Sequence, residues 1–142
     1  MVVVVRAGDE KTRKVFANEG IAVQECADAH LGMSRTLACG LRASPDAPGW
    51  LFALGDMPYV EPATIRAVAD AIGNGIAIPE FRGRRGNPVG FAGRYREELL
   101  ALEGDEGARS LLGRHAAQVK VVACDDPGVL RDIDRLEDLK GN

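Results

Sequence analysis

The stretch that constrains the fold most is residues 51–58, Leu-Phe-Ala-Leu-Gly-Asp-Met-Pro. A short apolar run that ends at turn residues is typical of a β-strand covered on both faces. In an open α/β sheet, ligands bind just beyond the carboxyl ends of such strands. Asp56 directly follows this run, so the pattern places a carboxylate where a metal ion or a phosphate-bearing substrate would be bound.

The length and composition fit one globular domain. The chain has 142 residues, of which 46% are hydrophobic and 27% charged, which is enough for a sizeable core. The net charge of −3 gives no general electrostatic reason to expect nucleic acid as a partner. Five arginines and no acid lie between residues 82 and 96, whereas acids dominate residues 125–138. This distribution fits either a site for phosphates and a divalent cation or two solvated surfaces.

The cysteine pattern indicates the cellular compartment. Cys26, Cys39 and Cys124 are widely spaced and include no Cys-x-x-Cys motif. We therefore expect reduced thiols and a cytoplasmic location rather than a disulfide framework. The four valines after Met1 are too few for a signal-peptide core or a membrane span, and they predict a strand.

Predicted strands alternate with predicted helices along the chain. The strands are expected at residues 2–5, 21–24, 50–54, 75–79, 88–91 and 119–124, and the helices at 10–18, 35–41, 62–72, 95–102 and 105–112. This alternation predicts βαβ units in a mostly parallel sheet with helices on both faces. Residues 88–91 and 130–133 follow short loops, so one or both are expected to pair antiparallel at an edge. A terminal helix is expected after residue 134.

Five short motifs stand in order along the chain. They are Gly-Met-Ser at 32–34, Leu-Gly-Asp-Met-Pro at 54–58, Arg-Arg-Gly-Asn-Pro-Val at 84–89, Gly-Asp-Glu-Gly-Ala-Arg at 104–109 and Asp-Ile-Asp at 132–134. Together they resemble the nucleotidyltransferases of molybdenum-cofactor maturation, in particular the molybdenum cofactor cytidylyltransferases. The resemblance implies a Rossmann-like, three-layer α/β fold with a mostly parallel sheet and an antiparallel edge, in a single domain over residues 1–142.

The resemblance also implies a reaction. A nucleotidyl group, expected to be CMP from CTP, is transferred to the phosphate of molybdopterin, and pyrophosphate is released. Asp56 and Asp134 match the two catalytic carboxylates that hold Mg²⁺ in the family. Mg²⁺ favours octahedral oxygen coordination by one or two carboxylates, waters and phosphates, and transfer at phosphorus depends on positioning and charge neutralisation. A molybdoenzyme or its chaperone is an expected protein partner.

The other candidate residues are expected to bind substrate. By resemblance, the basic loop at 84–88 contacts the pterin or its phosphate. Arginine suits phosphate through its forked guanidinium, and Gly83 and Gly86 let the backbone approach a ligand. Asn87 stands where the family often has histidine, and it retains a hydrogen-bond donor. The candidate set is Gly32, Met33, Ser34, Pro58, Arg85, Gly86, Asn87, Pro88 and Asp105.

Several candidates also have a purely structural interpretation. Asp56 would cap the helix that begins near Pro62, and Asp134 would cap a helix over residues 136–140. Ser34 and Asp105 would cap the helices that follow them. Alternatively, the N–H groups at residues 32–34 would hold an anion. The basic loop would be only a solvated surface.

Besides Asn87, the chain departs from the family in two places. After Asp134 the family usually continues with Thr-Pro, whereas this chain has Arg135 and Leu136. The family also begins with a strand and a glycine-rich loop that cradles the triphosphate, and we expect this first βαβ unit to be absent here. The chain alone could therefore lack activity. The alternative functions are a related sugar-phosphate nucleotidyltransferase and a non-catalytic molybdopterin-binding protein.

Overall fold

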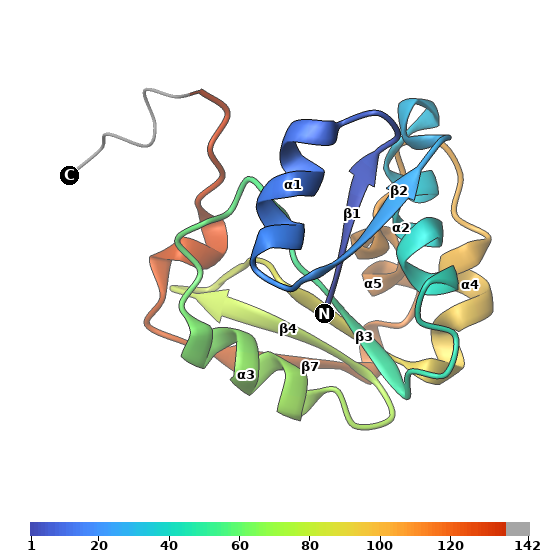
Figure 1. Cartoon of the computed structure of the whole chain (residues 1–142). Coiled ribbons are helices and arrows are strands. Elements are labelled where there is room, and N and C mark those ends of the chain that lie inside the picture. Colours follow the sequence, from blue (N-terminus) through green and yellow to red (C-terminus); the bar gives the residue numbers. More distant parts are fainter. Residues whose placement is uncertain (136–142) are drawn as a thin grey trace. The chain divides into compact units, whose positions relative to one another are not determined.

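The computed structural model describes residues 1–135, and the chain divides into two compact units (Figure 1). One unit comprises residues 1–48 and 94–114. The other comprises residues 49–93 together with the chain from His115 onward. Within residues 1–135, no helix has the length and apolar character that a membrane crossing would need.

The first unit is built on a small parallel sheet. β1 (Val2–Arg6) pairs in parallel with β2 (Ala22–Cys26), and α1 (Glu10–Asn18) connects the two strands. α2 (Met33–Arg42) packs on both strands and on α4 (Arg96–Leu100). The buried residues of α2 recur every three or four positions, as an amphipathic helix requires. They are Ser34, Leu37, Ala38 and Leu41. α5 (Leu111–Arg114) completes the helices of this unit.

The second unit is built on a five-stranded mixed sheet whose central strand is β4 (Ile76–Phe81). β4 pairs in parallel with β7 (Val119–Ala123) and antiparallel with β5 (Arg84–Arg85) and β6 (Val89–Ala92). β3 (Gly49–Phe52) pairs antiparallel with β6. α3 (Pro62–Ala71) lies along β4 and β7 (Figure 1). The core contains Val68, Ile76, Ile78, Val89 and Phe91, all less than 2% exposed.

The α/β class is confirmed, but the sheet differs from the prediction in detail. The antiparallel strand β6 lies between β3 and β4, in the interior of the sheet rather than at its edge. Residues 130–133 form no strand, because the Asp-Pro-Gly turn after β7 leads into a 3₁₀ helix over Pro127–Leu130. The predicted helix at 105–112 is replaced by a turn, a 3₁₀ helix (Ala108–Ser110) and α5. The predicted terminal helix lies outside the described residues.

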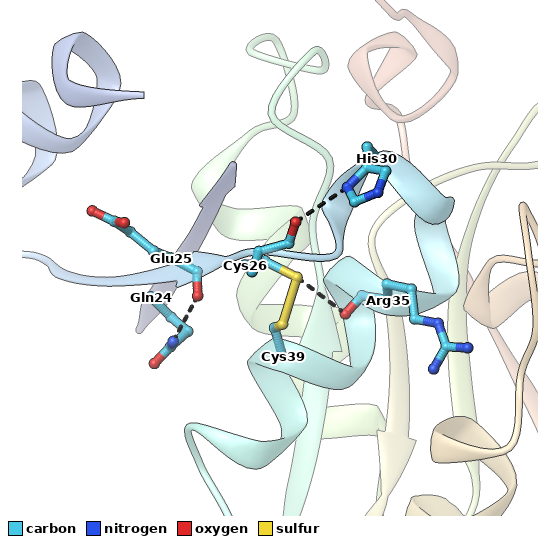
Figure 2. Close-up of a disulfide and its surroundings, with 7 residues drawn as sticks. Gln24, Glu25, Cys26, His30, Arg35 and Cys39 are labelled. Carbon is cyan, nitrogen blue, oxygen red and sulfur yellow. Dashed lines mark hydrogen bonds between the residues drawn. A yellow bond between two sulfur atoms is a disulfide. The ribbon is translucent and has the colours of Figure 1, made fainter. Parts of the chain in front are cut away.

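The prediction of three reduced cysteines is wrong for two of them. Cys26, at the end of β2, and Cys39, on α2, form a disulfide whose Cα atoms are 6.0 Å apart (Figure 2). Cys124 is free. The pair carries no motif, because it arises from the packing of α2 against β2 and not from local spacing.

The disulfide should contribute to stability. It closes a loop between residues 13 apart, and loops of about this size are stabilised by roughly 3 kcal/mol through the restricted unfolded state. We expect a reductant to lower the free energy of unfolding by up to about this amount in urea denaturation. Cys39→Ser should make stability insensitive to reductant, whereas Cys124→Ser should keep the full response. Alkylation of all three cysteines in unreduced, denatured protein would contradict the pairing.

α1 begins at a capping aspartate. The Asp9 carboxylate accepts a hydrogen bond from the Thr12 N–H at 3.1 Å. Hydrogen bonding from Thr12 favours the charged carboxylate and lowers the pKa of Asp9 below its ordinary value of 3.8. The predicted bounds of this helix are confirmed, and Gly20, with φ of 68°, supplies the left-handed conformation that follows it.

The Asp9 cap should make the stability of the protein depend on pH. Because the pKa of Asp9 is lower in the folded than in the unfolded state, the stabilisation is present above the unfolded value and is lost as pH falls through the folded value. We expect Asp9→Ala to lower the Tm at neutral pH, and the difference from wild type to shrink below pH 3.8. Thermal melts followed by circular dichroism across this range test it. Asp9→Asn, which keeps an uncharged acceptor, should lie between the two.

Candidate functional site

The three strands that precede the candidate residues of the second unit end at one edge of its sheet. β6 is antiparallel to both β3 and β4, so β3 and β4 run in the same direction, and β7 is parallel to β4. Asp56 follows β3, the basic segment follows β4, and the acidic segment follows β7. Ligands of open α/β sheets bind at this carboxyl edge.

The two predicted metal ligands lie on segments that are joined by a main-chain hydrogen bond. The Ile133 N–H donates to the Asp56 carbonyl oxygen at 2.7 Å. Asp134 is the next residue along the chain, and both aspartates are exposed. The fold thus brings together two carboxylate-bearing segments that are far apart in sequence.

The structural interpretation of Asp56 as a helix cap is wrong. The N-cap residue of α3 is Glu61, and its N–H donates to Asp126 rather than to Asp56. Within residues 1–135, the Asp56 carboxylate makes no hydrogen bond or ion pair, so its oxygens are accessible to a ligand. The cap that Asp134 would provide lies on residues outside the described part of the chain.

The donor set fits a hard divalent cation bound partly by substrate. Among residues 1–135, no three acidic, histidine or cysteine side chains gather closely enough to hold a metal ion. Mg²⁺ commonly binds to one or two protein carboxylates and takes its other ligands from water and substrate phosphates. Two exposed aspartates on adjoining segments match that coordination, whereas an all-protein cage would need more donors.

The basic segment forms a β-hairpin rather than a loose loop. Arg82 and Gly83 have φ of 49° and 76°, the two positive values of a type I′ turn, and β5 returns along β4. The conformational freedom of Gly83 thus serves the hairpin turn. The close backbone approach at Gly86 is made to Val129, because a Cβ at Gly86 would collide with the Val129 carbonyl oxygen.

A small apolar pocket adjoins the Asp56 loop. Its volume is about 170 Å³, below the roughly 300–1,000 Å³ typical of whole-ligand pockets, so it suits one end of a ligand. Three predicted substrate residues, Pro58, Asn87 and Pro88, line it together with Ala53, Leu54, Met57, Val60 and Ile65. Asn87 carries the only polar side chain in this lining. The main-chain N–H of Asn87 donates to the Val129 carbonyl oxygen at 2.9 Å, and the Asn87–Pro88 peptide bond is cis.

Four other predicted substrate residues gather in the first unit. The N–H and the hydroxyl of Ser34 both donate to the Gly104 carbonyl oxygen, at 3.1 and 2.8 Å. A Cβ at Gly32 would collide with this carbonyl and lie 3.0 Å from Asp105 Oδ1. The Met33 side chain is half exposed. Gly32–Ser34 and Gly104–Asp105 are therefore packed against each other.

The predicted capping roles in this cluster are wrong. Gly32 is the N-cap of α2, with φ of 119°, and Ser34 lies inside the first turn, where it bonds to Gly104. No helix begins after Asp105, because Gly104 adopts a left-handed φ of 55° and the following 3₁₀ helix starts after Gly107. The N–H of Ser34 is also committed to Gly104, so an anion at this turn would have to use the main chain of Gly32 or Met33.

Sequence reasoning missed Asp126. This residue is 2% exposed, and its carboxylate accepts hydrogen bonds from the N–H groups of Glu61 and Gly128. An aspartate before Pro-Gly is a recognisable turn signal. The signal does not reveal that the same side chain also reaches the start of α3.

Comparison with known proteins gives consistent matches. The family model of the MobA-like NTP transferase domain matches residues 1–121. The purine catabolism protein PucB of Bacillus subtilis (strain 168) is 32% identical over 117 residues, 80% of this chain, which spans only 57% of PucB. Rv0371c of Mycobacterium tuberculosis H37Rv, solved as a complex with manganese, is 28% identical with a TM-score of 0.77, over 98% of this chain and 74% of that one.

A more distant match concerns the fold alone. Molybdopterin-guanine dinucleotide biosynthesis protein A from Archaeoglobus fulgidus is 18% identical, with a TM-score of 0.63 over 96% of this chain and 74% of that one. These similarities agree with the Rossmann-like α/β class that the sequence predicts.

Substitution of Gly86 tests whether this glycine serves packing against Val129 or the approach of a ligand. Because a Cβ there would meet the Val129 carbonyl, we expect Gly86→Ala to lower the free energy of unfolding by about 1–3 kcal/mol in urea denaturation. Gly113→Ala, on α5 with nothing within 4 Å of the new Cβ, is the matched control and should not destabilise. Unchanged stability of Gly86→Ala together with weaker ligand binding would instead assign the glycine to ligand approach.

Proposed function

Because the chain belongs to the MobA-like NTP transferase family, we propose that it transfers CMP from CTP to the phosphate of molybdopterin and releases pyrophosphate. Membership of this family supports an activity of the nucleotidyltransferase class. The acceptor and the nucleotide are the proposed part, since the chain spans little more than half of the curated relative it matches.

The observation that carries the proposal is the hydrogen bond from Ile133 to Asp56. It supports a shared site because it joins the Asp-Ile-Asp segment to the Asp56 loop at 2.7 Å, at the carboxyl edge of the sheet. Asp56 and Asp134 would hold Mg²⁺, which when bound neutralises charge on the reacting phosphate. The manganese complex of Rv0371c supports a divalent cation in a similar protein.

The acceptor is proposed to bind on the same unit. Pro58, Asn87 and Pro88 would take one end of the pterin into the apolar pocket, where the Asn87 amide is the available polar group. Arg85, with Gly86 beside it at the base of the hairpin, would bind the acceptor phosphate through its guanidinium. The carboxylates and the arginine would then orient the two phosphates, which is the main contribution a protein makes to transfer at phosphorus.

The nucleotide side is proposed to involve the first unit. There Gly32, Met33, Ser34 and Asp105 form one cluster at the start of α2, where main-chain N–H groups favour anions. The choice of base stays open to test. The name of the A. fulgidus protein refers to guanine dinucleotide, so GTP is the competitor to compare with CTP.

The proposed compartment is the cytoplasm, with a molybdoenzyme or its chaperone as the receiving partner. The Cys26–Cys39 disulfide makes this testable, because cytoplasmic thiols are generally kept reduced. Alkylation of acid-quenched cells before lysis would show whether Cys26 and Cys39 are reduced or disulfide-bonded inside the cell.

Pyrophosphate release tests the proposed function directly. With Mg²⁺ and molybdopterin, we expect the protein that carries this chain to release pyrophosphate from CTP. Asp56→Ala and Asp134→Ala should reduce the rate about 100-fold or more, because each removes a proposed cation ligand. Asp46→Ala, an exposed acid in the loop before β3, is the control and should leave the rate unchanged.

Other outcomes distinguish the alternatives. Release with a sugar phosphate but not with molybdopterin would assign a related nucleotidyltransferase. Tight pterin binding with no release from either nucleotide would support a non-catalytic binding protein. Full activity of Asp56→Ala would remove the basis of the proposed mechanism.

A further inference from the structure

A buried aspartate outside the proposed ligand set holds two segments of the site together. Asp126 is 2% exposed, and each of its carboxylate oxygens accepts a main-chain hydrogen bond. Oδ2 accepts the N–H of Glu61 at 2.8 Å, and Oδ1 accepts the N–H of Gly128 at 2.8 Å. The side chain thereby joins the start of α3 to the turn after β7.

These donors lie on the two segments that carry the proposed cation ligands. Glu61 ends the loop that begins at Asp56, and Gly128 belongs to the segment that runs on to Asp134. Gly128 packs so closely on this loop that a Cβ would collide with the Tyr59 carbonyl oxygen. Asp126 therefore fastens one end of the paired segments, and the Ile133–Asp56 hydrogen bond fastens the other.

We propose that Asp126 is a positioning residue for the divalent-cation site, an inference that rests on the proposed function. Hydrogen bonds to a charged carboxylate are stronger than neutral ones, and losing the acceptor leaves buried N–H groups unsatisfied. Residues that orient metal ligands from outside the coordination sphere commonly have this character.

The proposed cation site depends on this support because, within residues 1–135, the Asp56 side chain makes no hydrogen bond or ion pair of its own. Its position therefore follows from its main chain. That main chain is held by the 126–133 segment, through Ile133 at 2.7 Å and, farther along, through Asp126. Loosening the Asp126 contact would therefore displace the carboxylates relative to each other. The hydrogen bonds of Asp126 and Ile133 lie outside the apolar core of the sheet.

Two variants each remove one of the two Asp126 hydrogen bonds, from opposite sides of the contact. Asp126→Asn keeps one oxygen acceptor but presents an N–H₂ donor to the second N–H group. Glu61→Pro removes the donor instead. Glu61 has φ of −69°, close to the value that proline imposes, so the substitution suits the backbone there. The matched controls are Asp125→Asn, which removes the neighbouring exposed charge, and Glu61→Ala, which keeps the N–H.

Mn²⁺ is the probe, measured by electron paramagnetic resonance of the unbound ion with the full protein. We expect the Kd to rise about 10- to 100-fold in Asp126→Asn and Glu61→Pro, and to stay at the wild-type value in both controls. Turnover at saturating Mn²⁺ should return close to wild type, because the change lies in cation binding and not in the reacting groups. The double variant should bind no more weakly than the weaker single variant, since both remove one contact.

The comparison with Asp56→Asn separates failure of the inference from failure of the proposed function. If Asp126→Asn and Glu61→Pro bind Mn²⁺ like wild type while Asp56→Asn does not, Asp126 is merely structural and the inference is overturned. If Asp56→Asn also binds like wild type, the proposed cation site itself is wrong. Melting curves ensure that every variant is measured while folded, and a lower Tm without a change in Kd would also overturn the inference.

Discussion

One stretch of chain, residues 126–133, connects the loops that follow β3 and β5. Its residues bond to Glu61 and Asp56 on one loop and to Asn87 on the other, with distances of 2.7 to 2.9 Å. Because these bonds use backbone groups or a buried carboxylate, they fix the loops without occupying the exposed side chains. The segments that carry Asp56 and Asp134 are therefore joined through their main chains while both side chains stay exposed, which suits a cation site formed partly by substrate.

The helices and strands predicted well from the sequence are those whose sequence signals lie within a few residues of one another. The bounds of α1 are the predicted ones, and α3 begins at Pro62 as its first-turn proline indicates, because caps and periodicity are read within a few residues. The place of β6 is different. The apolar run at residues 88–91 predicts a strand, but the antiparallel position of β6 between β3 and β4 depends on partners distant in sequence. The same limit applies to the Cys26–Cys39 pair.

The candidate site shows a similar division. Asp56 is a candidate from sequence because a carboxylate that directly follows a predicted strand is a local pattern, and that position lies at the edge of the sheet where ligands bind. Asp126 was missed because its proposed role depends on burial and on a contact with Glu61, 65 residues away. Gly86 is predicted from sequence to let the backbone approach a ligand, whereas the structure shows close packing against Val129. A glycine in a motif indicates that a backbone approaches something closely, and only the fold shows what that is.

The distribution of candidates between the two units bears on the chemistry. The carboxylate segments, the basic hairpin and the apolar pocket all belong to the second unit, whose sheet fixes their mutual geometry. The cluster at the start of α2 belongs to the first unit and is ordered by its own bonds to Gly104. Substitutions in the proposed cation and acceptor site can thus be studied separately from substitutions in the cluster at the start of α2.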